Sequence, residues 1–157
     1  GLGVDAVAFL DADNWYRPDH IASRLSEMDL HQADCGSSSR TLCRLDGTVM
    51  GSCPMTDPDR FIDTNAMLFG RQAFHQLHHW VLMPSYGHLI GDRIMLNHVK
   101  RSKLKRHHLE QGSVFYRCAK EGLYRQMGEV IPDGVQPRPD YEASFRQWEA
   151  DGQPPLR

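Results

Sequence analysis

Two aspartates, Asp11 and Asp13, follow directly on the apolar segment VDAVAFL at residues 4–10. A nearly continuous apolar run rich in β-forming residues is typical of a strand covered on both faces, so we expect a central parallel strand there. Pro18 suits the first turn of a helix, and the apolar spacing after it predicts a helix over residues 18–31. The two carboxylates are therefore predicted to lie in a turn from the carboxyl end of a strand into a helix.

The chain has 157 residues, the size of one domain, and a chain of this length buries roughly two-thirds of the surface that its unfolded form exposes. It is 40% hydrophobic and 24% charged with a net charge of -2, which indicates a globular protein without a charge bias that would name a partner. No apolar run approaches the roughly 20 residues of a membrane-spanning helix. No basic segment precedes the first apolar stretch, so we expect no secretion signal.

The four cysteines form no CxxC pair; they are Cys35, Cys43, Cys53 and Cys118. This spacing favours reduced thiols in a cytoplasmic protein, with a disulfide between two of the first three as the less favoured alternative. His75 and His79 have the spacing that puts two side chains on one helical face, but no third ligand is evident. We therefore do not predict a zinc site from the cysteines and the nine histidines.

The rest of the chain predicts short strands and helices followed by a proline-rich end. Asp46-Gly47 is a strong turn signal and predicts a hairpin within residues 36–53. Downstream we expect, in order, a strand at 64–70, a helix at 71–80, a loop at 81–88, a helical segment at 89–104 and a strand at 113–119. The sequence thus divides into a main portion at residues 1–131 and a proline-rich linker with a short helix at residues 132–157.

The position of Asp11 and Asp13 suggests a metal site, because open α/β sheets bind their ligands at the carboxyl ends of strands. Two carboxylates in one turn can face a single cation. Mg²⁺ and Mn²⁺ take oxygen ligands and commonly share their remaining positions with substrate phosphates. The alternative is a plain turn and helix start, where Asp and Asn are common residues.

Three segments in this order resemble the family 2 glycosyltransferases: VAFLDADNWYRPDHI at residues 7–21, FIDTNAMLFGRQAF at 61–74 and GHLIGDRIMLNHV at 87–99. The resemblance covers roughly residues 4–120 and implies the GT-A fold. The expected fold class is α/β, a partial GT-A-like mixed sheet flanked by helices that lacks most of the N-terminal half that binds the nucleotide. We therefore expect a fragment of a longer transferase, with weak or no donor binding by itself.

The resemblance implies transfer of a sugar, usually with inversion, from a nucleotide-diphosphate donor such as a UDP-sugar to an acceptor hydroxyl, with Mn²⁺ or Mg²⁺ as the cofactor. Asp11 and Asp13 match the family's DxD motif, with Asp13 as the direct metal ligand and Asp11 nearer the ribose or the metal's waters. Asp92 matches the general base, although Gly91 stands where many members carry a second acidic residue. The alternative for Asp92 is an aspartate that only stabilises a helix N-terminus.

The resemblance also implies a sugar or acceptor pocket formed by Asn65, Ala66, Trp80, Tyr86, His88 and Arg93. Aromatic faces pack well on sugar rings, which favours this role for the aromatic residues before the base. Packing of the same side chains within the protein's own core is the alternative.

The run KRSKLKRHH at residues 100–108 is strongly basic but has no interleaved aromatic residues, so we expect no nucleic-acid partner. A solvated helix end explains this run, and peripheral contact with the inner surface of a membrane is the functional alternative. A truncated sheet with an unpaired edge would also favour association of the chain with a second copy.

Two other functions stay open. Haloacid-dehalogenase-like phosphatases also place a DxD after an apolar strand, using the first aspartate as a nucleophile beside Mg²⁺. These phosphatases have other residues after the motif, where this chain has Asn14 and Trp15. They also need a basic residue, commonly a lysine, and the first lysine of this chain is Lys100. The second alternative is a non-catalytic binding module derived from the transferase fold.

Overall fold

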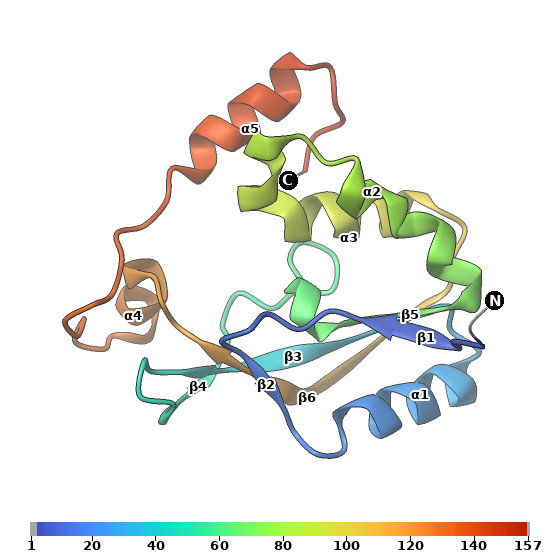
Figure 1. Ribbon diagram of the computed structural model, residues 1–157, viewed down its shortest axis with the longest axis horizontal. Coiled ribbons are helices and arrows are strands. Elements are labelled where there is room, and N and C mark those ends of the chain that lie inside the picture. Colours follow the sequence, from blue (N-terminus) through green and yellow to red (C-terminus); the bar gives the residue numbers. More distant parts are fainter. Residues whose placement is uncertain (1–2, 157) are drawn as a thin grey trace.

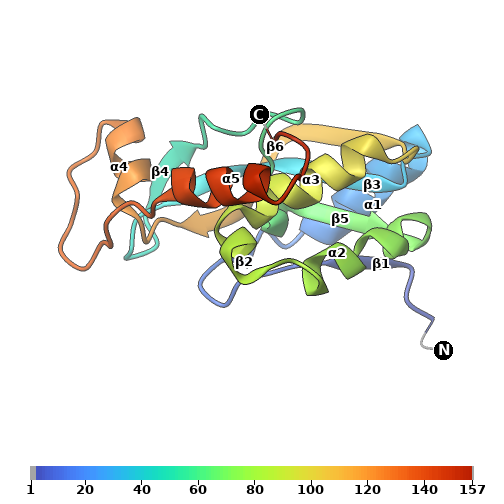
Figure 2. The same ribbon diagram turned by 90° about the horizontal axis from the view of Figure 1, so that it is seen from above.

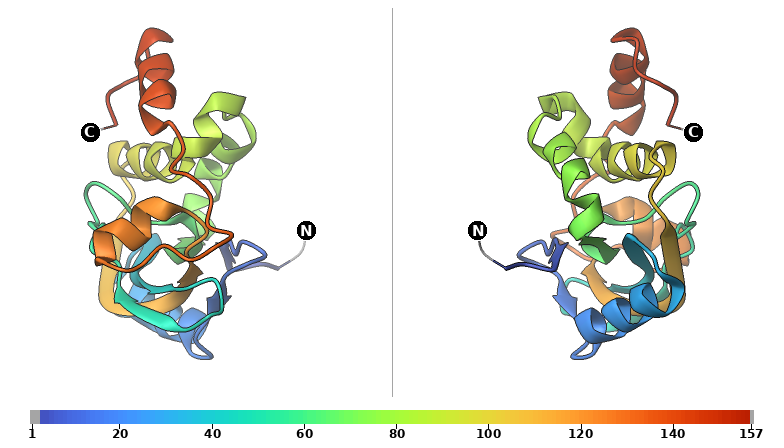
Figure 3. Two further views of the ribbon diagram at one scale, coloured as in Figure 1. Left: turned by 90° about the vertical axis from the view of Figure 1, so that its left-hand side faces the viewer. Right: turned by 90° about the vertical axis from the view of Figure 1, so that its right-hand side faces the viewer.

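The computed structural model describes residues 3–156, which form an α/β structure with helices on both faces of a curled mixed sheet (Figure 1). The strands are ordered β1 (Ala6–Ala8), β5 (Met67–Gly70), β3 (Cys35–Cys43), β6 (Arg106–Arg117) and β2 (Trp15–Tyr16), and β4 (Val49–Ser52) pairs with β3. Helix α1 (His20–His31) covers one face, and α3 (Gly91–Arg101) covers the other (Figure 3). The predicted α/β class is confirmed.

The strand before the aspartates is not the central parallel strand that its apolar pattern predicts. Within residues 3–156, β1 is an edge strand that pairs antiparallel with β5, with Val7 opposite Phe69. All three of its residues are only half-buried. The prediction is wrong because an apolar run indicates a covered strand but carries no information about which neighbours it pairs with or in which direction.

The turn that carries the aspartates leads into a strand before it reaches the helix. Asp11 and Asp13 follow β1, and β2 then pairs antiparallel with β6. The side chain of Asn14 is buried and its Oδ1 accepts a hydrogen bond from the amide of Arg117 at 2.9 Å, which attaches the turn to the end of β6. Helix α1 begins two residues later than the predicted start at residue 18 and ends where it was predicted to end.

The hairpin of β3 and β4 is confirmed, with Gly47 in its turn at φ +87°. Strand β6 begins at Arg106, earlier than predicted, and runs parallel to β3. Strict alternation along β3 would put Ser38 and Arg40 on the same face of the sheet. The pairing register of β3 with β6 shifts between these two residues, so they lie on opposite faces. Ser38 meets Ser113 on the α1 side, whereas Arg40 meets Asp63 on the α3 side.

The segment between β5 and β6 is more broken than predicted. The expected helix at 71–80 consists of the 3₁₀-helix η2 (Arg71–Gln76) and the α-helix α2 (His78–Val81), and the expected loop contains the 3₁₀-helix η3 (Ser85–Ile90). Helix α4 (Glu121–Met127) was not predicted, whereas α5 (Tyr141–Ala150) was. Helix α5 packs against η3 (Figure 2). Its Trp148 is buried in the main core.

The main core lies between the sheet and α3, and a smaller one lies between β3 and α4. All four cysteines are buried free thiols, as the spacing predicts. None of the helices formed by residues 3–156 has the length and apolar character needed to cross a membrane.

Candidate functional site

Asn65 joins the turn after β1 to the loop before β5. Its side chain is buried in the 3₁₀-helix η1 (Thr64–Ala66). The amide of Asp11 donates a hydrogen bond to Asn65 Oδ1 at 2.6 Å, and Asn65 Nδ2 donates to Asp11 Oδ2 at 2.8 Å. A side-chain amide offers an acceptor oxygen and two N–H donors. This pair of hydrogen bonds therefore leaves one N–H free to donate to a further partner.

That further partner is Asp63, whose Oδ1 accepts hydrogen bonds from the backbone amide of Asn65 at 2.9 Å and from its Nδ2 at 2.7 Å. The other carboxylate oxygen, Oδ2, forms an ion pair with Arg40. Both charged side chains are about 95% buried, and the Arg40 guanidinium lies over the ring of Tyr116, 4.1 Å from its centroid. Asp63 is therefore a buried, fully engaged carboxylate that holds the loop in place, not one free to react.

Asp92 lies in the first turn of α3 and faces the same loop. Its Oδ1 accepts hydrogen bonds from the amide of Thr64 at 3.0 Å and from the Thr64 hydroxyl. Burial, reinforced by the negative charge of Asp63, raises the pKa of Asp92 to about 7, against the opposing effects of Thr64 and Arg40. Both hydrogen bonds end on Oδ1, and none from the described residues ends on Oδ2.

Asp11 and Asp92, which lie 81 positions apart in the chain, each bond to a residue of η1. Asp11 bonds to Asn65, and Asp92 bonds to Thr64, the residue before it. The sequence indicates Asp11, Asn65 and Asp92 as site residues but not Thr64 and Asp63. The available signal for Asp63 was its place two residues before Asn65, the pattern in which an aspartate side chain accepts from the backbone ahead of it.

The two residues of the DxD motif are open to solvent. Asp11 and Asp13 are both exposed, and Asp11 Oδ2 is held by Asn65, with a longer contact of 3.5 Å from Asn14. The donor set is chemically suited to Mg²⁺ or Mn²⁺, which prefer carboxylate oxygens. Among the described residues, no third Asp, Glu, His or Cys ligand atom groups with them, so such an ion would complete its coordination with water or substrate oxygens.

The residues predicted to line an acceptor pocket contact different parts of the fold. Trp80 packs on Phe9, with ring centroids 5.7 Å apart, while Tyr86 donates a hydrogen bond to Asp151 in the C-terminal segment. Ala66 is buried in the main core, and His88 is exposed. Arg93 donates to the carbonyl of Arg60 at 3.1 Å and lies near the rings of Phe61 and Phe145.

Gly91 has a structural reason to be a glycine. A Cβ atom at this position would lie 2.9 Å from the ring of Trp80, closer than carbon atoms approach without a shift. The second acidic residue that the resemblance leads one to expect there would therefore displace Trp80 from Phe9. In this chain the tryptophan occupies the space, and Asp92 is the single carboxylate at the start of α3.

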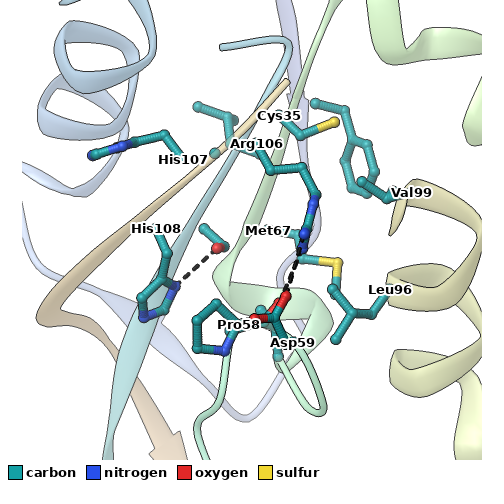
Figure 4. A pocket seen from close by; sticks show the side chains of 14 residues that line it. Cys35, Pro58, Asp59, Met67, Leu96, Val99, Arg106, His107 and His108 are labelled. Carbon is teal, nitrogen blue, oxygen red and sulfur yellow. Dashed lines mark hydrogen bonds and ion pairs between the residues drawn. The ribbon is translucent and has the colours of Figure 1, made fainter. Parts of the chain in front are cut away.

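Two cavities lie away from these carboxylates. One, of about 120 Å³, is enclosed by β3, β5, β6 and α3, with mostly apolar walls and an Arg106–Asp59 ion pair beside it (Figure 4). The other, of about 280 Å³, lies between α2, η3, α3 and the C-terminal segment. Asp11, Asp13 and Asp92 line neither cavity.

No known protein family and no curated protein matches this sequence. The glycosyltransferase resemblance accordingly stands on the quoted segments alone.

Proposed function

We propose that this chain carries the acceptor-activating and metal-binding part of a sugar transferase that uses a nucleotide-diphosphate sugar, expected to be a UDP-sugar. The observation that supports it is that adjacent residues of η1 hold Asp11, through Asn65, and Asp92, through Thr64. The same short segment thus contacts one of the two solvent-open aspartates and a carboxylate whose pKa is raised to about 7. A general base works best when its pKa lies near the working pH, because it is then both deprotonated and basic enough to take a proton.

In the proposed reaction, Asp92 takes the proton of an acceptor hydroxyl as that oxygen attacks the anomeric carbon. The new carbon–oxygen bond forms while the bond from the sugar to the diphosphate breaks, and the diphosphate leaves with the electron pair. Attack opposite the leaving group inverts the anomeric carbon. Asp11 and Asp13 would hold Mg²⁺ or Mn²⁺, which neutralises the charge of the departing diphosphate. Thr64 keeps the Asp92 carboxylate pointed at the acceptor.

The phosphatase alternative has less support. Its nucleophilic aspartate needs a basic partner, and the group that contacts Asp11 here is the neutral amide of Asn65. The raised pKa of Asp92 favours a catalytic role over a purely non-catalytic module.

The remaining proposals concern the location of the protein and its contacts with a membrane or with a second copy. The basic run at residues 100–108 spans the end of α3 and the start of β6, with Lys100 and Arg106 bonded to the loop carbonyls of Asp59 and Pro58. We retain peripheral contact with the inner surface of a membrane, a cytoplasmic location and association through a sheet edge as proposals.

The test measures, in the full-length protein, release of nucleoside diphosphate from a panel of nucleotide-diphosphate sugars with Mn²⁺, and binding of UDP with Mn²⁺ by calorimetry. Asp92→Asn should retain binding and slow release by at least about 100-fold. Asp13→Ala should abolish the metal-dependent part of UDP binding. Asp133→Asn, a change at an exposed carboxylate away from the site, is the control. Equal turnover in Asp92→Asn, or metal-independent binding of equal strength in Asp13→Ala, would remove the residue concerned from the proposal.

A further inference from the structure

A second set of potential metal ligands lies on the opposite face of the sheet, where the end of α1 meets the start of β6. Glu27 and His31 are one helical turn apart and face the same way, and His107 reaches them from the strand. His107 and His108 are consecutive in β6 and point to opposite sides. Figure 4 shows His108 beside the cavity, hydrogen-bonded to the Ser37 hydroxyl, and His107 directed away from it toward α1.

The ligand atoms of these three residues already have the spacing of a coordination sphere. Glu27 Oε2 lies 3.2 Å from His107 Nε2 and 3.6 Å from His31 Nε2, and all three atoms lie within 4.8 Å of one another. In a tetrahedral site with bonds of 2.0–2.1 Å, neighbouring ligand atoms are separated by about 3.3 Å. The two imidazole rings are stacked, with centroids 3.8 Å apart and an interplanar angle of 12°, and the Nε2 atoms of both approach the same oxygen, Glu27 Oε2.

The backbone around the three residues is held by hydrogen bonds. The amides of Asp34 and Cys35 both donate to the carbonyl of Lys105, at 2.8 and 3.1 Å, and the Lys105 amide donates to Asp34 Oδ2 at 2.9 Å. These bonds tie the segment that follows α1 to the residue just before β6. The distance between His31 and His107 is therefore set by the fold and not by two mobile side chains alone.

Arg24 leaves the Glu27 carboxylate available to a metal ion. Arg24 lies one turn earlier on α1, and its Nη1 donates to the carbonyl of Ser37 at 2.7 Å instead of pairing with Glu27. The side chains of Glu27, His31 and His107 are 33%, 47% and 24% exposed, so an ion can enter from solution and water can complete its coordination.

We propose that Glu27, His31 and His107 form a binding site for a Zn²⁺-type transition metal ion that clamps the end of α1 to the start of β6. Two imidazoles and one carboxylate are ligands typical of Zn²⁺, with water in the fourth position. Mg²⁺ and Mn²⁺ favour all-oxygen sites, so this site is chemically distinct from that proposed at Asp11 and Asp13 and does not depend on it.

The test is calorimetry of the untagged chain with Zn²⁺, repeated with Mg²⁺. We expect one Zn²⁺ bound per chain at this site, and Glu27→Gln and His107→Ala should each weaken it at least tenfold. His75→Ala, a change at an exposed histidine elsewhere, and Asp13→Ala should leave Zn²⁺ affinity unchanged. Because Glu27→Gln preserves size and shape, it separates loss of a ligand from loss of the fold, which circular dichroism checks directly.

A thermal readout accompanies the titration. Zn²⁺ should raise the melting temperature of the unaltered chain, a chelator should reverse the rise, and Glu27→Gln should abolish it. Absence of saturable Zn²⁺ binding would overturn the proposal. So would full retention of binding in both Glu27→Gln and His107→Ala with loss in His79→Ala, because the ion would then lie at the stacked rings of His79 and His98 instead.

Discussion

Asp11 and Asn65 exchange two hydrogen bonds across 54 positions of the chain, one to the backbone amide of Asp11 and one to its carboxylate. The contact sets the direction of the Asp11 side chain at the open end of β1. It also connects this side chain with Asp63, since Asn65 Nδ2 donates to both carboxylates. The orientation of the predicted metal ligand thus depends on a neutral amide between two negative groups.

Replacing Asn65 with aspartate tests this arrangement. The change keeps an oxygen that can accept from the Asp11 amide but removes Nδ2 and adds a third carboxyl beside Asp11 and Asp63. We expect a loss of roughly 2 kcal/mol or more at pH 8, from the unmatched carboxylates. The loss should shrink toward pH 5, because like charges raise the pKa of the new carboxyl in the folded state and its protonated form can donate.

The measurement is urea unfolding of Asn65→Asp at both pH values. Asn97→Asp provides the matched control, because Asn97 makes only a 3.4 Å contact with the carbonyl of Pro155. A penalty that stays constant with pH would show that repulsion between carboxylates is not its cause.

Thr64→Val tests whether the hydrogen bond from Thr64 sets the pKa of the proposed base, Asp92. Valine keeps the shape of threonine but removes the hydroxyl that donates to Asp92, and that bond lowers the pKa of Asp92. The pKa of Asp92 should therefore rise further, so the acid limb of the pH–rate profile should move to higher pH while the alkaline limb stays. We also expect a loss of about 1 kcal/mol in stability. An unshifted acid limb would mean that Asp92 is not the titrating base.

Removing one partner of the buried ion pair between Arg40 and Asp63 should destabilise the fold more than removing both charges. Arg40→Met leaves the Asp63 carboxylate buried without a counter-ion, which costs about 3–5 kcal/mol of unfolding free energy. Adding Asp63→Asn removes the stranded charge and retains a side-chain oxygen for the amide of Asn65. The double variant should be more stable than Arg40→Met alone in urea unfolding. Strictly additive losses would contradict this account.

His20 should make the fold sensitive to mild acid. Burial, together with the positive charge of Arg24, lowers the pKa of His20 from 6.5 to about 4. As the pH falls through this window, the unfolded chain binds a proton that the folded chain excludes, so stability is lost, by at most about 3 kcal/mol. Asp92 works against this trend, because its raised pKa lets the folded chain bind a proton below about pH 7.

His20→Gln isolates the contribution of His20 to the pH dependence of stability, because glutamine can still hydrogen-bond to Ser113. In the unaltered chain the Ser113 hydroxyl lies 2.8 Å from His20 Nδ1. Unfolding free energies of His20→Gln should fall less steeply between pH 6.5 and 4 than those of the unaltered chain. His75→Gln, at an exposed position, should leave the slope unchanged. Equal slopes for all three proteins would show that His20 titrates normally in the folded state.

Short-range features of the fold could be predicted from the sequence. The spacing of apolar residues after Pro18 located α1, Asp46 and Gly47 located the hairpin turn, and the pattern after Pro132 located α5. Each depends on backbone preferences or side-chain periodicity within about a dozen residues. Helix α4 was missed because it is only seven residues long, and a helix this short is stabilised mainly by packing of residues such as Leu123 and Tyr124.

The sequence indicated several residues of the candidate site but not the hydrogen bonds and ion pairs between them. Asp11, Asn65 and Asp92 lie in the three segments that resemble the transferases, whereas the roles of Thr64 and Asp63 follow from contacts with residues tens of positions away. Trp80 and Tyr86, predicted as part of an acceptor platform, have partners that the sequence did not indicate, namely Phe9 and Asp151 in the C-terminal segment. Side-chain partners of this kind depend on volumes that must be filled, which no local pattern encodes.

By itself, the sequence determined the helix α1, the hairpin turn and the helix α5, and where two carboxylates follow a strand. Only the tertiary structure decided that β1 pairs antiparallel at an edge, that a register shift turns Arg40 toward Asp63, and that His107 meets Glu27 and His31. The physical reason is range. Backbone propensity acts between neighbours in the chain, whereas strand register, burial and charge pairing are settled by the packing of all the elements together.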